Sequence, residues 1–208
     1  MRVAAFVSHF YGAAVLQALI DLSPTVQVVL VVTDDPKSKH SNASRRLWKY
    51  GWDESLRSLV PRIAVRHGIP VVSENIRSAH FEDAFLQAKP NSILSCIFGQ
   101  RIPQSCLDHV SQRAYNLHMS TPGYGLELTR GSAALETLVT SGKSIADMIL
   151  HRMTIDFDNG ETVARSTTIP LPADTLETPR SIVDYFQATA ELPATLIRNE
   201  FVRVFKAG

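Results

Sequence analysis

The residues best suited to chemistry are an amide and an imidazole near the middle of the chain, in the apolar segment AYNLHMS at 114–120. This run predicts a short strand, in which residues two apart point to the same side. Asn116 and His118 would then face one cavity, while Leu117 faces the core. An amide donates a hydrogen bond without changing charge, and an imidazole can also move a proton near neutral pH. The pair suits a carbonyl oxygen that becomes an oxyanion, and it would equally suit the capping of a strand end in a tight turn.

An acidic turn about forty residues further along supplies a carboxylate. Asp156 and Asp158 lie two apart in it, and Asp158 comes just before Asn159-Gly160, where turn geometry would hold it. A carboxylate beside His118 would favour the imidazolium and raise the pKa of the ring. The sequence therefore predicts a proton-handling pair together with an amide donor.

Alternating strands and helices are the elements that would position these groups. Val3–Val7 and Val26–Thr33 are continuous apolar runs, and residues 13–22 between them have the apolar spacing of a helix. Runs without alternation suit strands buried on both faces of a parallel sheet, so the chain opens with a βαβ unit. The pattern continues with strands expected at 70–72, 91–98 and 114–120 and helices at 55–67, 79–87 and 104–110.

The last third of the chain departs from this alternation. Strand-like runs at 145–155 and 161–169 flank the acidic turn and predict a hairpin. A helical pattern from Thr178 to Val204 follows, which Pro193 should kink or divide. This helix would pack internally or pair with another subunit in a homodimer.

We therefore predict a single domain over residues 1–208 with an α/β fold. Its sheet would be open, mostly parallel, twisted and Rossmann-like, with helices on both faces and a closing C-terminal helix. Ligands bind such sheets at the carboxyl ends of the strands. The polar residues expected at that edge are His9, Gln100, Asn116 and His118.

Composition excludes several classes of function. The formal net charge is +1 with 20% charged residues, so nothing in the bulk charge points to nucleic acid or an anionic membrane. No apolar run is long enough for a membrane span, and Cys96 and Cys106 form no metal or disulfide pattern. We expect a cytoplasmic protein without a metal. Four further histidines lack ligand spacing and are interpreted as structural or surface residues: His67, His80, His109 and His151.

The segment 34–51 is rich in basic residues and has two interpretations. It would be a solvated loop, or a lid that clamps an anionic group of a substrate, since loops after sheet strands often carry binding residues. Three aromatic residues at alternate positions, Trp48, Tyr50 and Trp52, would anchor it to the body. The basic residues are Lys37, Lys39, His40, Arg45, Arg46 and Lys49.

The sequence contains no nucleophile elbow, no Gly-X-Gly-X-X-Gly and no P-loop, which disfavours acyl-enzyme, dinucleotide and nucleoside triphosphate chemistry. From about Pro90 to Ile169 the order of its motifs instead resembles the folate-dependent formyltransferases. That family includes the methionyl-tRNA, glycinamide ribonucleotide and sugar N-formyltransferases. The shared motifs are Phe-Gly-X-X-Ile-Pro at 98–103, Asn-X-His at 116–118, Pro-Gly at 122–123, Gly-Ser-Ala-Ala at 131–134 and Asp-X-Gly at 158–160.

The resemblance implies a reaction and a set of residues. Asn116, His118 and Asp158 match the catalytic residues of the family, whose donor is 10-formyltetrahydrofolate and whose acceptor is a primary amine of a small molecule. The pterin of the donor would lie against backbone of 98–102 and of the turn at 156–160. The implied cofactor-binding residues are Phe98, Gly99, Gln100, Arg101, Ile102, Asp156 and Gly160.

Departures from the family bear on the acceptor. Met119 stands where the family usually has Pro, and residues 120–130 replace its Ser-Leu-Leu-Pro stretch. His9-Phe10-Tyr11-Gly12 replaces a glycine-rich phosphate loop, which argues against glycinamide ribonucleotide. The near-zero net charge argues against tRNA. The implied acceptor contacts are His9, Tyr11, Tyr124 and Arg130.

The basic segment makes an anionic acceptor, such as a nucleotide-linked amino sugar, the favoured prediction. The alternative acceptor is an amino-acid amine of the ornithine or hydroxyornithine type. Two other hypotheses stay open: a non-catalytic relative that binds folate, and a Rossmann-like protein of another function.

Overall fold

We describe a computed structural model of the chain, which places residues 1–34, 54–111, 113–131, 133–156, 158–171 and 179–207. The basic segment and its aromatic residues, at 35–53, for which the sequence predicts a solvated loop or a lid, lie outside the described residues. Among the described helices, none combines the length and apolar character that crossing a membrane requires.

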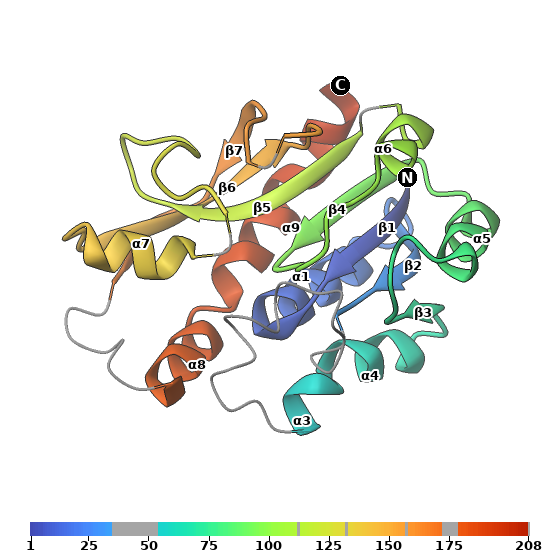
Figure 1. Ribbon diagram of the computed structural model, residues 1–208, viewed down its shortest axis with the longest axis horizontal. Helices are drawn as coiled ribbons and strands as arrows, with labels where there is room; N and C mark the ends of the chain where they lie inside the picture. The colour runs from blue at the N-terminus through green and yellow to red at the C-terminus, as the bar shows by residue number, and fades with distance from the viewer. Residues whose placement is uncertain (35–53, 112, 132, 157, 172–178, 208) are drawn as a thin grey trace.

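The central element is a twisted sheet with strand order β3-β2-β1-β4-β5-β6-β7 (Figure 1). Strands β3 to β5 in this order are mutually parallel, and β6 and β7 run antiparallel to their neighbours. The expected open, mostly parallel sheet ending in a hairpin is confirmed. The strands are β1 Arg2–Val7, β2 Gln27–Val32, β3 Val71–Val72, β4 Ser92–Cys96, β5 Ala114–Ser120, β6 Ile145–Arg152 and β7 Thr162–Arg165, with β8 Ile169–Pro170 pairing with β6.

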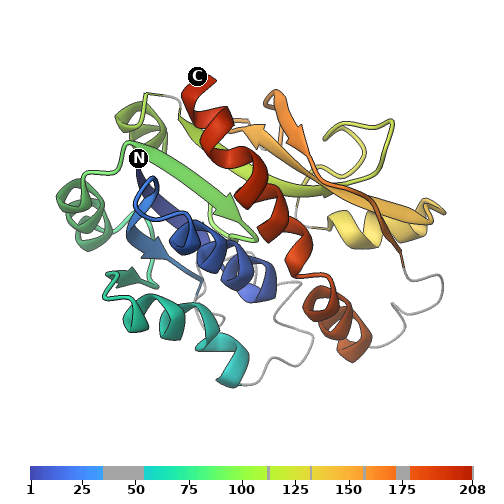
Figure 2. The ribbon, with the colours of Figure 1, turned by 180° about the vertical axis from the view of Figure 1, so that it is seen from behind.

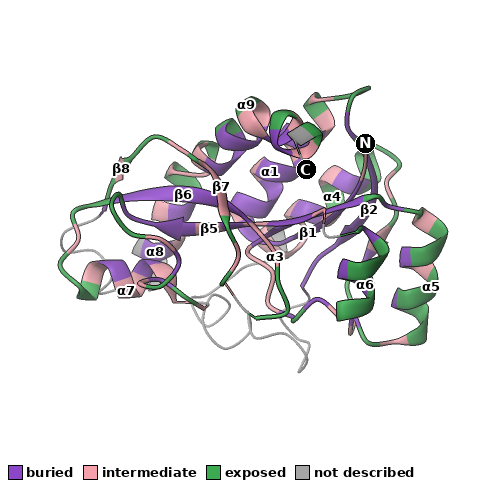
Figure 3. Cartoon of the chain, turned by 90° about the horizontal axis from the view of Figure 1, so that it is seen from above, coloured by how far each residue is buried: buried purple, intermediate pink, exposed green. Residues whose placement is uncertain are grey.

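Helices cover both faces of the sheet, as predicted. Helices α1 (His9–Asp21), α4 (Leu59–Arg66) and α9 (Glu191–Ala207) lie on one face, and α5 (Ala79–Ala88) and α6 (Gln104–His109) lie on the other (Figure 3). Helix α9 runs beside α1 across the sheet (Figure 2). The remaining helices are α3 Glu54–Arg57, α7 Ala134–Thr140 and α8 Pro179–Ala188.

Continuous burial explains why the first strands form. In β1, Val3 to Val7 are all fully buried, with apolar side chains packed in cores on both faces of the sheet. Gly12 lets α1 lie close to this strand, because a Cβ there would come within 2.9 Å of the Val7 carbonyl carbon. The chain continues from β1 to β2 on one side and returns to β4 on the other. The connections that leave β1 and β4 therefore run in opposite directions, which makes the carboxyl ends of these two strands a topological switch point, the usual ligand site of such sheets.

Several predicted boundaries were wrong. The helix expected at 55–67 is divided at Ser58, the first hairpin strand ends at Arg152, and the second is split into β7 and β8. The C-terminal helix is divided, but at Thr189 and Ala190 and not at Pro193. Pro193 lies in the first turn of α9, where a missing N–H leaves no helical hydrogen bond unmade.

The closing helix packs within the chain. Phe186 of α8 and Phe201 of α9 are buried in the larger core, and the Phe201 ring lies 5.9 Å from the ring of Tyr115. These two aromatic side chains therefore pack within the chain, which is the first of the two arrangements expected for the C-terminal helix.

Candidate active site

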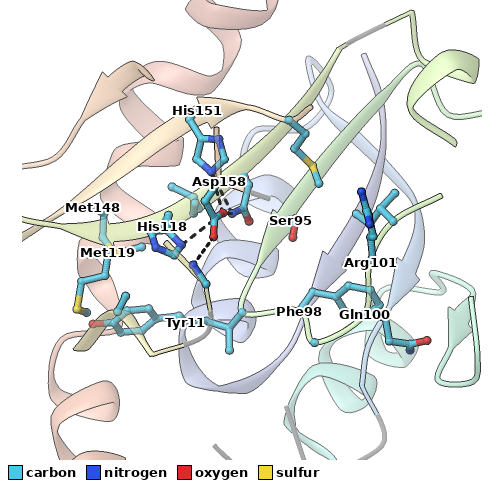
Figure 4. A pocket seen from close by; sticks show the side chains of 18 of the residues that line it. Tyr11, Ser95, Phe98, Gln100, Arg101, His118, Met119, Met148, His151 and Asp158 are labelled. Carbon is cyan, nitrogen blue, oxygen red and sulfur yellow. Dashed lines mark hydrogen bonds and ion pairs between the residues drawn. The ribbon is translucent and has the colours of Figure 1, made fainter. Parts of the chain in front are cut away.

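A cavity of about 390 Å³ opens at the carboxyl ends of β4 and β5. Its wall combines β5, α7, Tyr11 of α1, Phe186 of α8, the segment 97–102 that follows β4, and the segment 153–158 that follows β6. Ligand sites of this size and position are common in open α/β sheets. Figure 4 shows the side chains of 18 of the residues that line it.

The predicted polar trio meets in this cavity. Asn116 and His118 both line the cavity from β5, as the strand spacing predicted. The Asn116 amide Nδ2 donates to Oδ1 of Asp158 at 3.3 Å, and His118 Nδ1 lies 3.7 Å from the same oxygen (Figure 4). The two residues therefore do more than cap a strand end, because they converge on one carboxylate from another part of the chain.

Local backbone geometry fixes Asp158. Its φ is 46°, in the left-handed region where Asp and Asn are tolerated better than most residues. Its Oδ2 accepts a hydrogen bond from the Gly131 amide at 2.9 Å, and the next residue, Asn159, accepts one from Arg130 at 2.9 Å. The turn thus holds the carboxylate towards β5, which agrees with the expected choice of Asp158 over Asp156.

His151 belongs to the same cluster, and of the two expected alternatives, structural or surface, its position is the buried one. It pairs with Asn116 across the antiparallel β5–β6 ladder. Its Nδ1 lies 2.8 Å from the carbonyl of Arg152, which can only accept, so Nε2 is the free acceptor and takes a hydrogen bond from Asn116 Nδ2 at 3.1 Å. His151 Nε2 is also 3.6 Å from Asp158. The sequence signal that could have pointed to His151 is its position as a polar residue inside an otherwise apolar strand.

The protonation of His118 differs from the prediction. Burial lowers the pKa of the ring below its usual value and outweighs the neighbouring Asp158, which raises it. The expected imidazolium is therefore wrong near neutral pH. Nε2 lies 2.6 Å from the carbonyl of Thr129 and donates to it, so the neutral ring presents the lone pair of Nδ1 towards Asp158.

Asp158 stays ionised. Burial alone would raise its pKa, but its interactions with His151, with His118 and with the Gly131 amide together leave the pKa below its ordinary value. The cluster therefore pairs a fixed anion with a neutral, buried base. Such an arrangement can accept a proton and stabilise the cation that results.

The segment predicted to hold the cofactor forms one end of the cavity, with all of 98–102 on the wall. Buried Asp34, which sequence reasoning did not single out, accepts hydrogen bonds from the Gly99 amide at 2.7 Å and from Ser8 Oγ at 3.1 Å. Arg101 donates to the carbonyl of Ile155 at 2.6 Å and so joins the two segments that follow β4 and β6.

The side chain of Gln100 is turned towards Glu74 and Ile76, where it donates to one carbonyl at 3.0 Å and accepts from one amide at 3.2 Å. Asp156 is on the cavity wall, and Gly160 is not among the residues that line it. A Cβ on Gly160 would lie 1.8 Å from the carbonyl oxygen of Arg152, so this glycine serves the close approach of the hairpin strands.

The four predicted acceptor contacts are separated. Tyr11 lines the cavity, and its hydroxyl shares a 2.7 Å hydrogen bond with Thr189. His9 is buried against Phe186, with ring centroids 5.1 Å apart. Tyr124 bonds Lys143 at 3.0 Å. The cavity wall, as described, includes none of His9, Tyr124 and Arg130. In the loop that follows β5, Arg130 donates to Asn159 and Tyr124 accepts from Lys143. In the described residues there is also no group of three or more potential ligands arranged to hold a metal ion.

Comparison with known proteins identifies the family. Residues 1–190 match the family model described as formyl transferase. The chain belongs to the formyl transferase family. The match covers more of the chain than the motifs at 90–169, and it confirms the expected enzyme class, a formyltransferase.

Solved structures share the fold at low sequence identity. Phosphoribosylglycinamide formyltransferase from Anaplasma phagocytophilum has a TM-score of 0.69 and 17% identity, over 100% of this chain and 88% of that one. WlaRD, a sugar 3N-formyl transferase solved with dTDP and 5-N-formyl-THF, has a TM-score of 0.63 and 14% identity, over 100% and 64%. A formyltetrahydrofolate deformylase from Pseudomonas syringae has a TM-score of 0.67 and 11% identity, over 99% and 61%.

Proposed function

We propose that this protein transfers a formyl group from 10-formyltetrahydrofolate to a primary amine of a small molecule in the cytoplasm. The observation that carries the proposal is the convergence of Asn116, His118 and Asp158 on one cavity in a member of the formyl transferase family. Amide, neutral imidazole and carboxylate together supply an oxyanion donor, a base and the counter-charge for that base.

The end of the cavity formed by 98–102 and 153–156 suits the donor. Ile102, Leu107 and Met153 give it apolar walls, and the backbone of the two segments runs along its edge. A flat heterocycle with a polar rim needs this combination of apolar faces and backbone donors and acceptors. 10-Formyltetrahydrofolate would supply the formyl carbon there, with its own nitrogen as the leaving group.

Asn116 would stabilise the oxyanion. Its amide hydrogens are directed to His151 Nε2 at 3.1 Å and to Asp158 at 3.3 Å. The formyl oxygen can take the hydrogen of the longer bond as negative charge develops on it, while His151 keeps the amide oriented. The donor is thus preorganised, which is what makes such groups effective.

His118 would move the proton. As the amine attacks the formyl carbon, its nitrogen loses a proton to the Nδ1 lone pair, and Asp158 at 3.7 Å stabilises the imidazolium. When the tetrahedral intermediate collapses, the same proton passes to the departing folate nitrogen. The products are the N-formyl amine and tetrahydrofolate, and His118 returns to its neutral form.

Two acceptors predicted from the sequence remain part of the proposal: a nucleotide-linked amino sugar and an amino-acid amine of the ornithine type. The anionic candidate depends on the basic segment outside the described residues. A thermal-shift screen of nucleotide sugars against amino acids, with a folate present, separates them, because a true ligand stabilises the folded protein.

The decisive experiment mixes the purified protein with 10-formyltetrahydrofolate and a broad amine library, and then detects amines that gain a formyl group by mass spectrometry. We expect at least one N-formyl product and stoichiometric tetrahydrofolate. Release of formate without such a product would assign hydrolysis in place of transfer. Folate binding without any turnover would indicate a non-catalytic relative, and the absence of folate binding would remove the proposal.

A further inference from the structure

The proposed reaction does not use the carboxylate of Asp34, although this side chain is only 4% exposed. Asp34 lies just beyond β2, at the carboxyl end of the sheet. Its Oδ2 accepts a hydrogen bond from Ser8 Oγ at 3.1 Å, and the same Oγ accepts one from the Asp34 amide at 3.0 Å. These two bonds, which run in opposite directions, hold the carboxylate beside the end of β1. A buried carboxylate needs such contacts, because burial is costly for a charge that is not hydrogen-bonded.

The same oxygen of Asp34 also binds the donor segment, as we call residues 98–102 of the cavity wall. It accepts a hydrogen bond from the Gly99 amide at 2.7 Å, a distance typical of an N–H bonded to a charged acceptor. Ser8 reaches the start of this segment as well, since its amide donates at 3.3 Å to the carbonyl of Cys96, the last residue of β4. Hydrogen bonds therefore connect the ends of β1, β2 and β4 where the donor segment begins.

The backbone is strained at the point where it leaves β4. Ile97 has a φ of 51°, in the left-handed region that a β-branched residue rarely adopts. Such conformations persist only where surrounding contacts hold them. Gln100 and Arg101 are held through their side chains, by the segments that follow β3 and β6. Asp34 acts differently, because it binds a peptide N–H and so fixes the path of the backbone itself.

The direction of one N–H determines the direction of the neighbouring carbonyl. In a trans peptide, as between Phe98 and Gly99, the N–H and the preceding C=O point opposite ways. Asp34 draws the Gly99 N–H towards β2, which leaves the Phe98 carbonyl directed away from β2. In the sheet, β2 and β5 lie on opposite sides of β4, and the cavity opens at the ends of β4 and β5. The Phe98 carbonyl is therefore turned to the side on which the donor would bind.

We propose that Asp34 is a positioning residue for the formyl donor: through the Gly99 N–H it holds the donor segment in the form that receives the heterocycle of 10-formyltetrahydrofolate. This inference rests on the proposed function. The described cavity wall does not include Asp34, so the carboxylate acts only through the backbone that it binds. In Figure 4, Phe98 of the donor segment lies apart from the cluster of His118 and Asp158. Loss of Asp34 should therefore weaken folate binding and spare the chemical step.

The first test measures the Kd of tetrahydrofolate by isothermal titration calorimetry, which requires no knowledge of the acceptor. We expect Asp34→Ala to raise this Kd about 10- to 100-fold, the range for losing a hydrogen bond to a charged group. Asp34→Asn keeps a neutral oxygen that can accept the same bond, so its Kd should lie between those of the Ala variant and wild type. Ser8→Ala removes one bond to the carboxylate and should raise the Kd about threefold.

Ser92→Ala is the matched control, at the opposite end of β4. Ser92 is fully buried, and its Oγ donates to the carbonyl of Arg113 at 3.0 Å. This variant should lower the free energy of unfolding and leave the Kd of tetrahydrofolate unchanged. Urea denaturation of every variant separates a loss of stability from a loss of folate binding.

The outcomes distinguish this inference from the proposed function. Wild-type affinity in folded Asp34→Ala would overturn the inference and leave formyl transfer intact. If that variant does not fold, wild-type affinity in both Asp34→Asn and Ser8→Ala has the same meaning, as does equal weakening in Ser92→Ala. With a substrate amine in hand, Asp34→Ala should raise KM for the donor alone, and a fall in kcat without that rise would also overturn the inference. Failure of the wild-type protein to bind tetrahydrofolate would remove the proposed function itself.

Discussion

On one face of β5, Asn116 and His118 meet a carboxylate and a second imidazole; on the other, Leu117 and Met119 pack into the larger core. The backbone is the same strand, and alternation alone separates the two sets. The polar face is costly to maintain, because it buries groups that must be hydrogen-bonded or lose charge. Along β5, residues that serve catalysis therefore alternate with residues that stabilise the core. Substitutions on the polar face should lower activity, and substitutions on the apolar face should lower stability.

The largest expected effect is on the polar face. Asn116→Ala and His118→Ala should each lower kcat by about 10²–10³, the typical loss for an oxyanion donor or a positioned acid–base group. Steady-state kinetics with the best amine measures this, and circular dichroism checks folding. His67→Ala, at an exposed histidine, is the matched control. Near-wild-type turnover in either cavity variant would remove that residue from the mechanism.

Substitutions on the apolar face of β5 should lower the stability of the fold. Leu117 is 2% exposed within the core, so Leu117→Ala should lower the free energy of unfolding by about 2–5 kcal/mol. Urea denaturation measures the change, and Asn116→Ala in the same assay should lose clearly less. Similar losses for the two neighbours would break the division between the faces of β5.

The pH dependence of catalysis sharpens the assignment of the base. The pKa of His118 is lowered by burial, so its neutral form persists below pH 6.5 and the acid limb of kcat/KM should lie below that value. Asp158 raises this pKa, so Asp158→Asn should move the limb further towards acid as well as reduce the rate. A limb above pH 7, or one that moves towards alkali in Asp158→Asn, would contradict the neutral-base mechanism.

The smallest effect expected is on stability at mildly acidic pH. Burial also lowers the pKa of His9 well below its usual value, so the unfolded chain binds protons first as the pH falls below 6.5. The contribution of such a histidine to the free energy of unfolding is fully present above that pH. Below it, the free energy of unfolding should fall by up to about 1.4 kcal/mol per pH unit for each such histidine. Thermal unfolding of His9→Asn between pH 7.5 and 5 should show a smaller loss than wild type. An identical pH dependence would mean that His9 does not contribute.

The sequence determined the sheet, because continuous apolar runs separated by helical spacing fit few other folds. It also determined that Asn116 and His118 share a side, since a strand alternates strictly. Family motifs then supplied Asp158. Tertiary structure alone decided the rest. The antiparallel register brought His151 to Asn116. Burial lowered the pKa of His118 by more than the charge of Asp158 raises it, so the ring is neutral. Register, dielectric surroundings and the meeting of distant strand ends depend on contacts between remote segments, and local residue patterns do not encode these individually.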